Sequence, residues 1–128
     1  MKPSLFVGSS REAVRIAEAV QQNLQHIADV TPWSQSVFEL SKTTLHSLMK
    51  TVRHHDYAVF VFAPDDVVLL RNEVQLATRD NVMFELGMFI SALGPERCFF
   101  LVPSNIGDFR IPTDLAGITP ARYDPTSH

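Results

Sequence analysis

The chain has 128 residues, of which 45% are hydrophobic and 20% are charged, and its formal net charge is −3. This size and balance are typical of one ordinary globular domain over residues 1–128, and the mild acidity excludes direct nucleic-acid binding as the main activity, because phosphates need a basic face. The sequence has neither a signal-peptide pattern nor an apolar run of membrane-spanning length, so we expect a cytoplasmic protein without a membrane partner. The single cysteine, Cys98, lies in the apolar run RCFFLV, which favours a buried thiol over a reactive one.

The N-terminal segment predicts a strand followed by a helix. SLFVGSS at residues 4–10 is a short apolar run that ends in small residues. Ser9 with Glu12 matches the capping box that opens a helix. Apolar residues then recur at helical spacing, so we expect an amphipathic helix over residues 10–26.

A second strand and a second helix are predicted next. ADVTPWS at residues 28–34 favours a short strand that Pro32 stops. Ser36 with Glu39 forms another capping box, which predicts the start of a helix. One face of that helix is apolar and consists of Leu45, Leu48, Met49 and Val52.

The remaining segments continue the alternation of strands and helices. YAVFVFA at residues 57–63 has the continuous apolar character of a central parallel strand. Residues 64–80 form a long connection of weak periodicity, where we expect a functional loop. An apolar helix follows over residues 81–93, and CFFLVP at residues 98–103 predicts another buried strand. The tail, residues 108–124, predicts a loop, a helical turn near residues 114–116 and a last strand.

This alternation predicts an α/β fold with a parallel sheet of four or five strands, covered by helices on both faces. In such sheets, ligands bind at the carboxyl ends of the strands. We therefore expect Val7, Ala63 and Pro103 near one edge of the sheet, together with the loop around Trp33.

Several familiar α/β activities lack their motifs in this sequence. There is no phosphate-binding GxxxxGK[ST] loop, and VGSSREA has one glycine where a dinucleotide-binding fingerprint needs three. Asp65 and Asp66 after the third strand have no acidic partners after the first strand, which argues against a phosphoacceptor domain. The histidines, including the adjacent His54 and His55, lack metal-ligand spacing, so we predict no metal site.

The loop after the first strand favours binding of an anion. Ser9 and Ser10 supply hydroxyl groups at the expected start of a helix, where free backbone N–H groups favour phosphate, and Arg11 adds a positive charge. The alternative is that these serines only cap the helix.

Glu85 is the only charged residue between Val82 and Leu93. At about 100° per residue it lies beside the core-facing stripe of this helix, so we expect it at the core margin, facing a cleft. Burial would raise the pKa of Glu85, whereas the helix N-terminus and Arg79 would lower it. The alternative is a structural glutamate that pairs with Arg79 or caps a neighbouring backbone. The same helix is too apolar for one core stripe, so we expect further contacts with the domain or a neighbouring copy through Phe84, Met88 or Ser91.

A resemblance to a known family adds to these inferences. The matching features are FVGSS with Glu12 after it, FVFAPDD, the long block RDNVMFELGMFISALG, CFFLVP, and PTDLAGIT with a later YD. They cover nearly the whole chain, which resembles the bacterial TIR-like domains described as predicted nucleotide-binding proteins and related to the TIR modules of anti-phage STING effectors. The resemblance implies a flavodoxin-like, three-layer TIR fold, of the kind that also occurs as one domain excised from a longer effector.

The resemblance also implies an activity and a set of site residues. The glutamate of the FELG block is the catalytic residue of an NAD+ glycohydrolase in that family, which implies this role for Glu85, with NAD+ as substrate and no cofactor. An oxocarbenium-like ribose is stabilised by such a carboxylate. The implied substrate-binding residues are Ser9, Ser10 and Arg11 for phosphate, Trp33 or Phe6 for ring stacking, and Asp65, Arg79 and Asp80 at the pocket border. Trp33 has the alternative of packing beside Pro32, and Asp80 that of capping the helix.

Family members often carry a sensor domain and become active when TIR units assemble, so we expect other TIR units and a sensor domain or partner protein as partners. A non-catalytic module that binds a nucleotide or serves as an oligomerisation scaffold is the alternative function. A nucleoside-transferring enzyme of related fold is a third reading.

Overall fold

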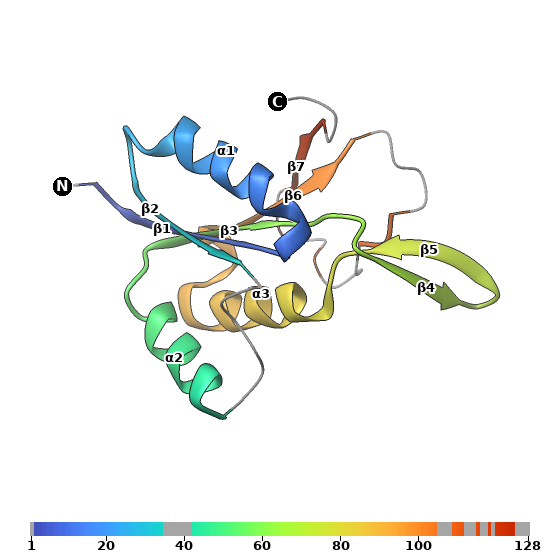
Figure 1. Cartoon of the computed structure of the whole chain (residues 1–128). Coiled ribbons are helices and arrows are strands. Elements are labelled where there is room, and N and C mark those ends of the chain that lie inside the picture. Colours follow the sequence, from blue (N-terminus) through green and yellow to red (C-terminus); the bar gives the residue numbers. More distant parts are fainter. Residues whose placement is uncertain are drawn as a thin grey trace.

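A five-stranded parallel sheet forms the middle of the molecule (Figure 1). The computed structural model describes residues 2–34, 42–104, 109–111, 115, 118 and 120–124. The strand order is β2-β1-β3-β6-β7, and every neighbouring pair in this sheet is parallel. The strands are β1 (Ser4–Ser9), β2 (Asp29–Ser34), β3 (Tyr57–Val61), β6 (Cys98–Pro103) and β7 (Pro120–Tyr123). The predicted α/β class with a parallel sheet of four or five strands is confirmed.

Helices cover both faces of the sheet (Figure 1). Helix α1 (Val14–Leu24), preceded by the 3-10 turn η1 (Arg11–Ala13), packs on one face through small residues such as Ala17. Helices α2 (Lys42–Val52) and α3 (Asp80–Leu93) pack on the other face. A second 3-10 turn, η2 (Pro95–Arg97), leads from α3 into β6. The result is the three-layer arrangement expected from the sequence.

The central strands are apolar because both of their faces are buried. In β1, Leu5 and Val7 belong to the core under α1, whereas Phe6 belongs to the core under α2 and α3. Cys98 is buried at the start of β6, and burial raises the pKa of its thiol to about 11. The prediction of a buried, unreactive thiol is therefore confirmed.

Two local predictions in the first half of the chain are wrong. Pro32 does not stop β2, which continues to Ser34, because β2 is an edge strand and tolerates a residue without an N–H donor. The capping box of Ser9 with Glu12 does not form: Ser9 belongs to β1, and Ser10 precedes η1 without a side-chain capping bond. The second capping box lies outside the described residues, as does most of the helical turn expected near residues 114–116.

The connection after β3 is a β-hairpin and not an irregular loop. Strand β4 (Asp66–Leu70) pairs antiparallel with β5 (Glu73–Ala77), and the two form a separate sheet. Arg71 and Asn72 form the two-residue turn, and their φ angles of 51° and 66° are those of the type I′ turn that suits the twist of a hairpin. This turn contains no glycine, which is why the sequence did not show it.

Gly8 allows β1 to lie against an aromatic ring of the core. A Cβ atom added at Gly8 would lie 2.6 Å from Cε1 of Phe60. We expect Gly8→Ala to lower the free energy of unfolding by about 1–3 kcal/mol, as overpacking in other cores does. The matched control is Gly87→Ala in α3, where no atom lies within 4 Å of the added Cβ.

Urea unfolding of the two variants measures the difference. The control variant should be as stable as the parent chain or up to about 1 kcal/mol more stable, because alanine favours helix more than glycine does. Equal stability of the two variants would contradict the close approach of β1 to Phe60.

Candidate active site

Three segments meet at the carboxyl edge of the sheet. They are the end of β1 with η1 (residues 9–12), the segment between β3 and β4 (residues 62–66) and the segment between β5 and α3 (residues 78–80). The parallel sheet brings the first two together, and the hairpin returns the chain to the same edge. The hydrogen bonds described below join all three.

Asp65 connects these three segments. Its Oδ1 accepts a hydrogen bond from Oγ of Ser10 at 2.8 Å, and its Oδ2 accepts one from the backbone N–H of Arg79 at 3.2 Å. Burial raises the pKa of Asp65, and the two hydrogen bonds oppose that rise. Asp65 thus fixes the start of α3 relative to the end of β1.

The Arg79 side chain lies between two carboxylates on the outer side of this edge. Its Nη1 lies 3.0 Å from Oε2 of Glu12, and its Nη2 lies 3.3 Å from Oδ1 of Asp66. A backbone hydrogen bond and then the bond from Arg79 lower the pKa of Glu12. The pairs are partly exposed, so each contributes little to stability. The alternative in which Arg79 pairs with Glu85 is wrong, because its guanidinium group binds Glu12 and Asp66 instead.

Glu85 of α3 is buried inside the protein. Its residue surface is 1% exposed, and neither carboxyl oxygen has a hydrogen-bond partner among the residues that the structure describes. Its flanking residues Val82, Leu86 and Phe89 are buried in the same core. The expectation of a carboxylate that faces a cleft at the core margin is therefore wrong, because the side chain points inward from its place on the helix.

Burial determines the protonation of Glu85. It raises the pKa of Glu85 from the ordinary value of 4.5 to about 8, so the group is mainly neutral at neutral pH. The expected lowering by Arg79 is absent, since Arg79 is engaged elsewhere. An unpartnered buried carboxyl group costs about 1–3 kcal/mol or more, which makes this position a candidate for function.

A second unpartnered polar group belongs to β1. Oγ of Ser9 is buried and has no hydrogen-bond partner within the described part of the chain. Helix α3, which carries Glu85, packs against β1 and β3. The two buried groups without partners therefore belong to elements in direct contact, and Ser9 lies at the carboxyl end of its strand, where the fold predicts a ligand.

The predicted phosphate-binding residues differ in their surroundings. Ser10 is buried and donates its hydroxyl to Asp65, whose carboxyl group beside it opposes a phosphate, so Ser10 is not free to bind one. Arg11 is exposed in η1. Asp80 is exposed and is the first residue of α3, after Arg79 at the N-cap position, so the alternative of a capping Asp80 is wrong.

The two rings predicted to stack on a substrate also differ. Phe6 is fully buried, and its ring centroid lies 4.4 Å from that of Phe89. In this conformation the ring of Phe6 belongs to the core, and its stacking on a substrate stays a prediction. The backbone of Trp33 lies in β2 beside Gly8, and its side chain is outside the described part of the structure.

Sequence reasoning missed four residues that hold this edge together. Glu12 and Asp66 bind Arg79, as described above. The hydroxyl oxygen of Thr78 accepts a hydrogen bond from the N–H of Ala63 at 3.4 Å, and the hydroxyl of Tyr123 donates one to the carbonyl of Phe62 at 2.8 Å. The signal available in the sequence was the position of these acidic and hydroxyl residues, which lie close to the ends of predicted strands and helices.

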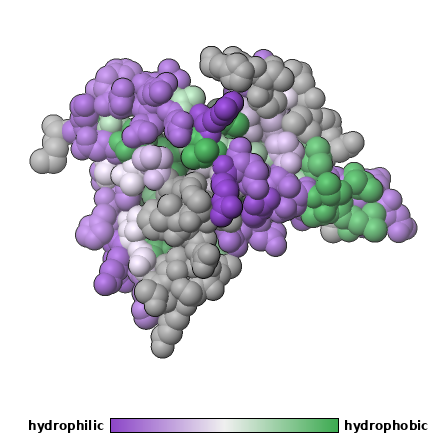
Figure 2. Space-filling model, in the orientation of Figure 1, coloured by the Kyte–Doolittle hydropathy of each residue, from purple (hydrophilic) through white to green (hydrophobic). Residues whose placement is uncertain are grey.

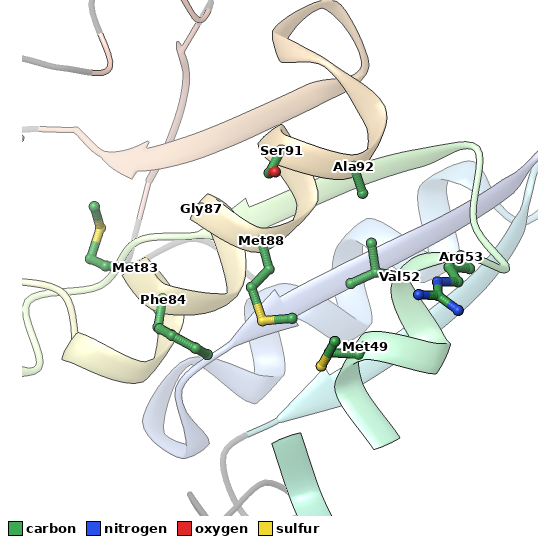
Figure 3. A pocket seen from close by; sticks show the side chains of 9 residues that line it. All are labelled: Met49, Val52, Arg53, Met83, Phe84, Gly87, Met88, Ser91 and Ala92. Atoms are coloured by element: carbon green, nitrogen blue, oxygen red, sulfur yellow. The ribbon is translucent and has the colours of Figure 1, made fainter. Parts of the chain in front are cut away.

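A cavity of about 630 Å³ lies between α2 and α3 and does not include Glu85 among its lining residues (Figure 3). Phe84, Met88 and Ser91 of α3 line it, opposite Met49 of α2 and Arg53, which directly follows α2. Phe84 is 44% exposed. The expected additional contacts of this helix with a neighbouring copy therefore stay a prediction.

Residues 4–125 match the family model described as CAP12/Pycsar effector protein, TIR domain. The chain belongs to this TIR domain family. CD-NTase-associated protein 12 of Sphingobacterium faecium is 38% identical over 127 residues, which cover 99% of this chain and 38% of that protein. Pycsar effector protein PaPycTIR of Pseudomonas aeruginosa is 40% identical over 120 residues, covering 93% of this chain and 39% of that protein.

The TIR domain thus spans about two fifths of the length of these relatives. CD-NTase-associated protein 12 of Niabella drilacis shows the same relation, with 36% identity over 132 residues and 41% of its length covered. Within the described residues, no helix is long and apolar enough to cross a membrane.

The buried position of Glu85 predicts a specific dependence of stability on pH. Between about pH 5 and pH 8 the unfolded chain has released the Glu85 proton and the folded chain still holds it. The contribution of Glu85 is therefore full below its unfolded pKa of 4.5 and is lost as the pH rises towards about 8. We expect the free energy of unfolding to fall by at most about 1.4 kcal/mol per pH unit from this group.

Urea unfolding of the parent TIR domain and Glu85→Gln over this pH range isolates the effect. The amide does not titrate, so subtraction removes the contributions of all other groups, and the difference should change steadily between about pH 5 and pH 8. A difference that does not depend on pH would mean that Glu85 has an ordinary pKa.

Proposed function

We propose that this TIR domain hydrolyses the nicotinamide–ribose bond of NAD+ and that Glu85 is its catalytic residue, in an effector of anti-phage defence. The observation that carries the proposal is the buried carboxyl group of Glu85, which has no partner among the described residues. Such a group in an otherwise apolar helix lowers the stability of the fold, and destabilising groups of this kind are common in active sites. The family description and the name of the relative PaPycTIR describe effectors, which supports this role.

The chemistry of this bond suits a site with one carboxyl group. The bond between C1′ of the ribose and N1 of the nicotinamide breaks, and its electron pair stays on the nitrogen, which neutralises the cationic ring. No acid is needed to protonate this leaving group. Positive charge develops on the ribose, water adds to C1′ and releases a proton, and the products are ADP-ribose and nicotinamide.

Glu85 has two properties that this reaction uses. A carboxylate beside the ribose stabilises the developing positive charge or holds the ribose hydroxyls. Its pKa of about 8 also suits a group that takes up a proton from the attacking water near neutral pH. A cationic substrate favours the ionised form of a neighbouring carboxyl group, so binding of NAD+ lowers the pKa of Glu85 and prepares the charge that the transition state needs.

The other residues at this edge are proposed to hold the substrate. Ser9 has a buried hydroxyl without a partner in the described structure and can donate a hydrogen bond, and Arg11 provides an exposed charge for phosphate. Trp33 or Phe6 is proposed to stack on a ring of the substrate. Asp65 and Arg79 position the start of α3 and border the site, as does the exposed Asp80. We assign no resident metal or cofactor to this site.

We further propose that activity depends on assembly of TIR domains in the cytoplasm. The relatives named CD-NTase-associated protein 12 are longer than this chain, so a sensor domain or a separate partner has room to bring TIR domains together. A nucleotide-binding scaffold without catalysis remains the competing function, and the loss of activity in one variant distinguishes the two.

Glu85→Gln should reduce NAD+ cleavage at least a hundredfold while the fold is kept. The substitution preserves size and removes the charge, and electrostatic stabilisation of this kind contributes about 3 kcal/mol or more to the transition state. The assay follows release of nicotinamide by chromatography at high protein concentration with a crowding agent, which favours assembly. The matched control is Glu18→Gln, on the exposed side of α1 and outside the three segments that form this edge.

The control should cleave NAD+ at the parent rate, and both variants should keep the parent circular dichroism spectrum. If the parent chain binds NAD+ and releases no nicotinamide even when assembled, the scaffold function replaces the enzyme. If Glu85→Gln is folded and fully active, Glu85 is not the catalytic residue.

A further inference from the structure

The β4–β5 hairpin carries an apolar face into solvent. It projects from the body of the domain, and Figure 2 shows hydrophobic surface over the projecting part. Val67, Leu69 and Val74 are 69%, 68% and 63% exposed, and the pairing of Leu69 with Val74 places both on one face of the hairpin. A two-stranded hairpin alone is marginally stable in water, so such a face is expected to gain a partner.

The outer edge of β4 is available for backbone hydrogen bonding. On the opposite edge of the hairpin, the carbonyl of Leu76 accepts a hydrogen bond from the N–H of Arg110 at 2.6 Å, so Leu76 directs its backbone groups away from β4. Along an antiparallel ladder, the backbone groups of both residues in such a pair point outward. Val67, which pairs with Leu76, and Leu69 two residues later therefore face the outer edge of β4, where no described strand pairs with them.

The charges along this edge are arranged so that the strand complements itself. Asp65 and Asp66 lie at the base of β4, where they also bind Ser10 and Arg79 of their own domain, and Arg71 lies in the turn that follows its tip. Arg71 is exposed and has no hydrogen bond or ion pair with any described residue. Antiparallel pairing of two copies places the tip of one strand beside the base of the other, and so places Arg71 beside the acidic residues of the second copy.

We propose that the outer edge of β4 pairs antiparallel with the same edge of a second copy of this TIR domain. A two-fold axis perpendicular to the joined sheet requires that paired residues of the two β4 strands lie on the same face of the sheet. Few registers of the two strands meet this condition. The register centred on Val68 places Val67 opposite the second copy's Leu69 and Arg71 opposite its Asp65.

The size of this contact predicts when it forms. Two paired five-residue strands bury a far smaller area than the roughly 1,200 Å² that a stable interface buries. Free TIR domains should therefore associate only weakly through this contact. Domains held together by another part of a longer protein reach a high local concentration, at which this contact forms. This inference rests on the proposed function in one respect, because it names a surface for the proposed assembly of TIR domains. The geometry of the surface does not depend on catalysis. Strand β5 leads directly into Thr78 and Arg79, so the contact adjoins the candidate active site.

Disulfide trapping with Val68→Cys tests the register directly. Val68 lies on the proposed axis, in a pair that is not hydrogen-bonded, where the two Cα atoms are about 4.5 Å apart and a disulfide fits. The native Cys98 is 1% exposed and does not compete. Under mild oxidation at high protein concentration, we expect a covalent dimer to form at least tenfold faster than in the matched control Gln75→Cys. Gln75 pairs with Val68 within the hairpin, but it lies on β5, away from the proposed axis.

Two further variants separate this contact from random collision. Leu69→Cys should cross-link slowly, because the two residues are offset from each other in the proposed register. Arg71→Glu in the Val68→Cys chain should slow cross-linking at least fivefold and leave the circular dichroism spectrum unchanged. Equal cross-linking at positions 68, 69 and 75 would overturn the proposed pairing.

The NAD+ assay distinguishes the two proposals. Cross-linking at position 68 without any NAD+ cleavage would support the surface and reject the enzyme. Cleavage of NAD+ by the parent chain without selective cross-linking at position 68 would reject the surface and leave the enzyme intact.

Discussion

A carboxyl group in a dry interior must find a partner or stay protonated, and Glu85 is the residue at which this constraint acts. Its neighbours on α3 are apolar and its oxygens have no partner in the described structure, so burial alone raises its pKa to about 8. Asp65 holds the start of the same helix through hydrogen bonds with Ser10 and the backbone of Arg79. These hydrogen bonds fix the start of the helix that carries the buried group.

Much of the fold follows from local patterns in the sequence. The continuous apolar runs of β1, β3 and β6 predicted a parallel sheet, because only strands buried on both faces have that composition. The length of β2 was not predictable in the same way. A proline ends a strand in the middle of a sheet but is tolerated in an edge strand, and whether β2 lies at the edge depends on the strand order of the whole fold. The hairpin was missed because Arg71 and Asn72 adopt positive φ without the glycine that usually marks such a turn.

The candidate site was predictable only in part. The sequence showed that Glu85 is unusual, because a single charge in an apolar helix is visible as a pattern. It did not show the depth of burial, since helical spacing fixes where a residue leaves the helix and not which way its side chain turns. The partners of Arg79 are 67 and 13 residues away in the chain, and no local pattern encodes such pairs. Phe6 lies in the core because helices cover both faces of β1, so that side chains on either face of this strand are buried.

The central claim is that Glu85 is neutral in the free TIR domain and becomes charged beside a cationic ribose. A ¹³C-NMR titration of the chain labelled at the glutamate carboxyl carbons tests it directly, with the Glu85 signal identified by its loss in Glu85→Gln. The account predicts a titration midpoint near 8 in the free domain and a lower midpoint with a carbocyclic NAD+ analogue, which keeps the positive charge and resists hydrolysis. A midpoint near the ordinary value of 4.5 in the free domain would contradict it.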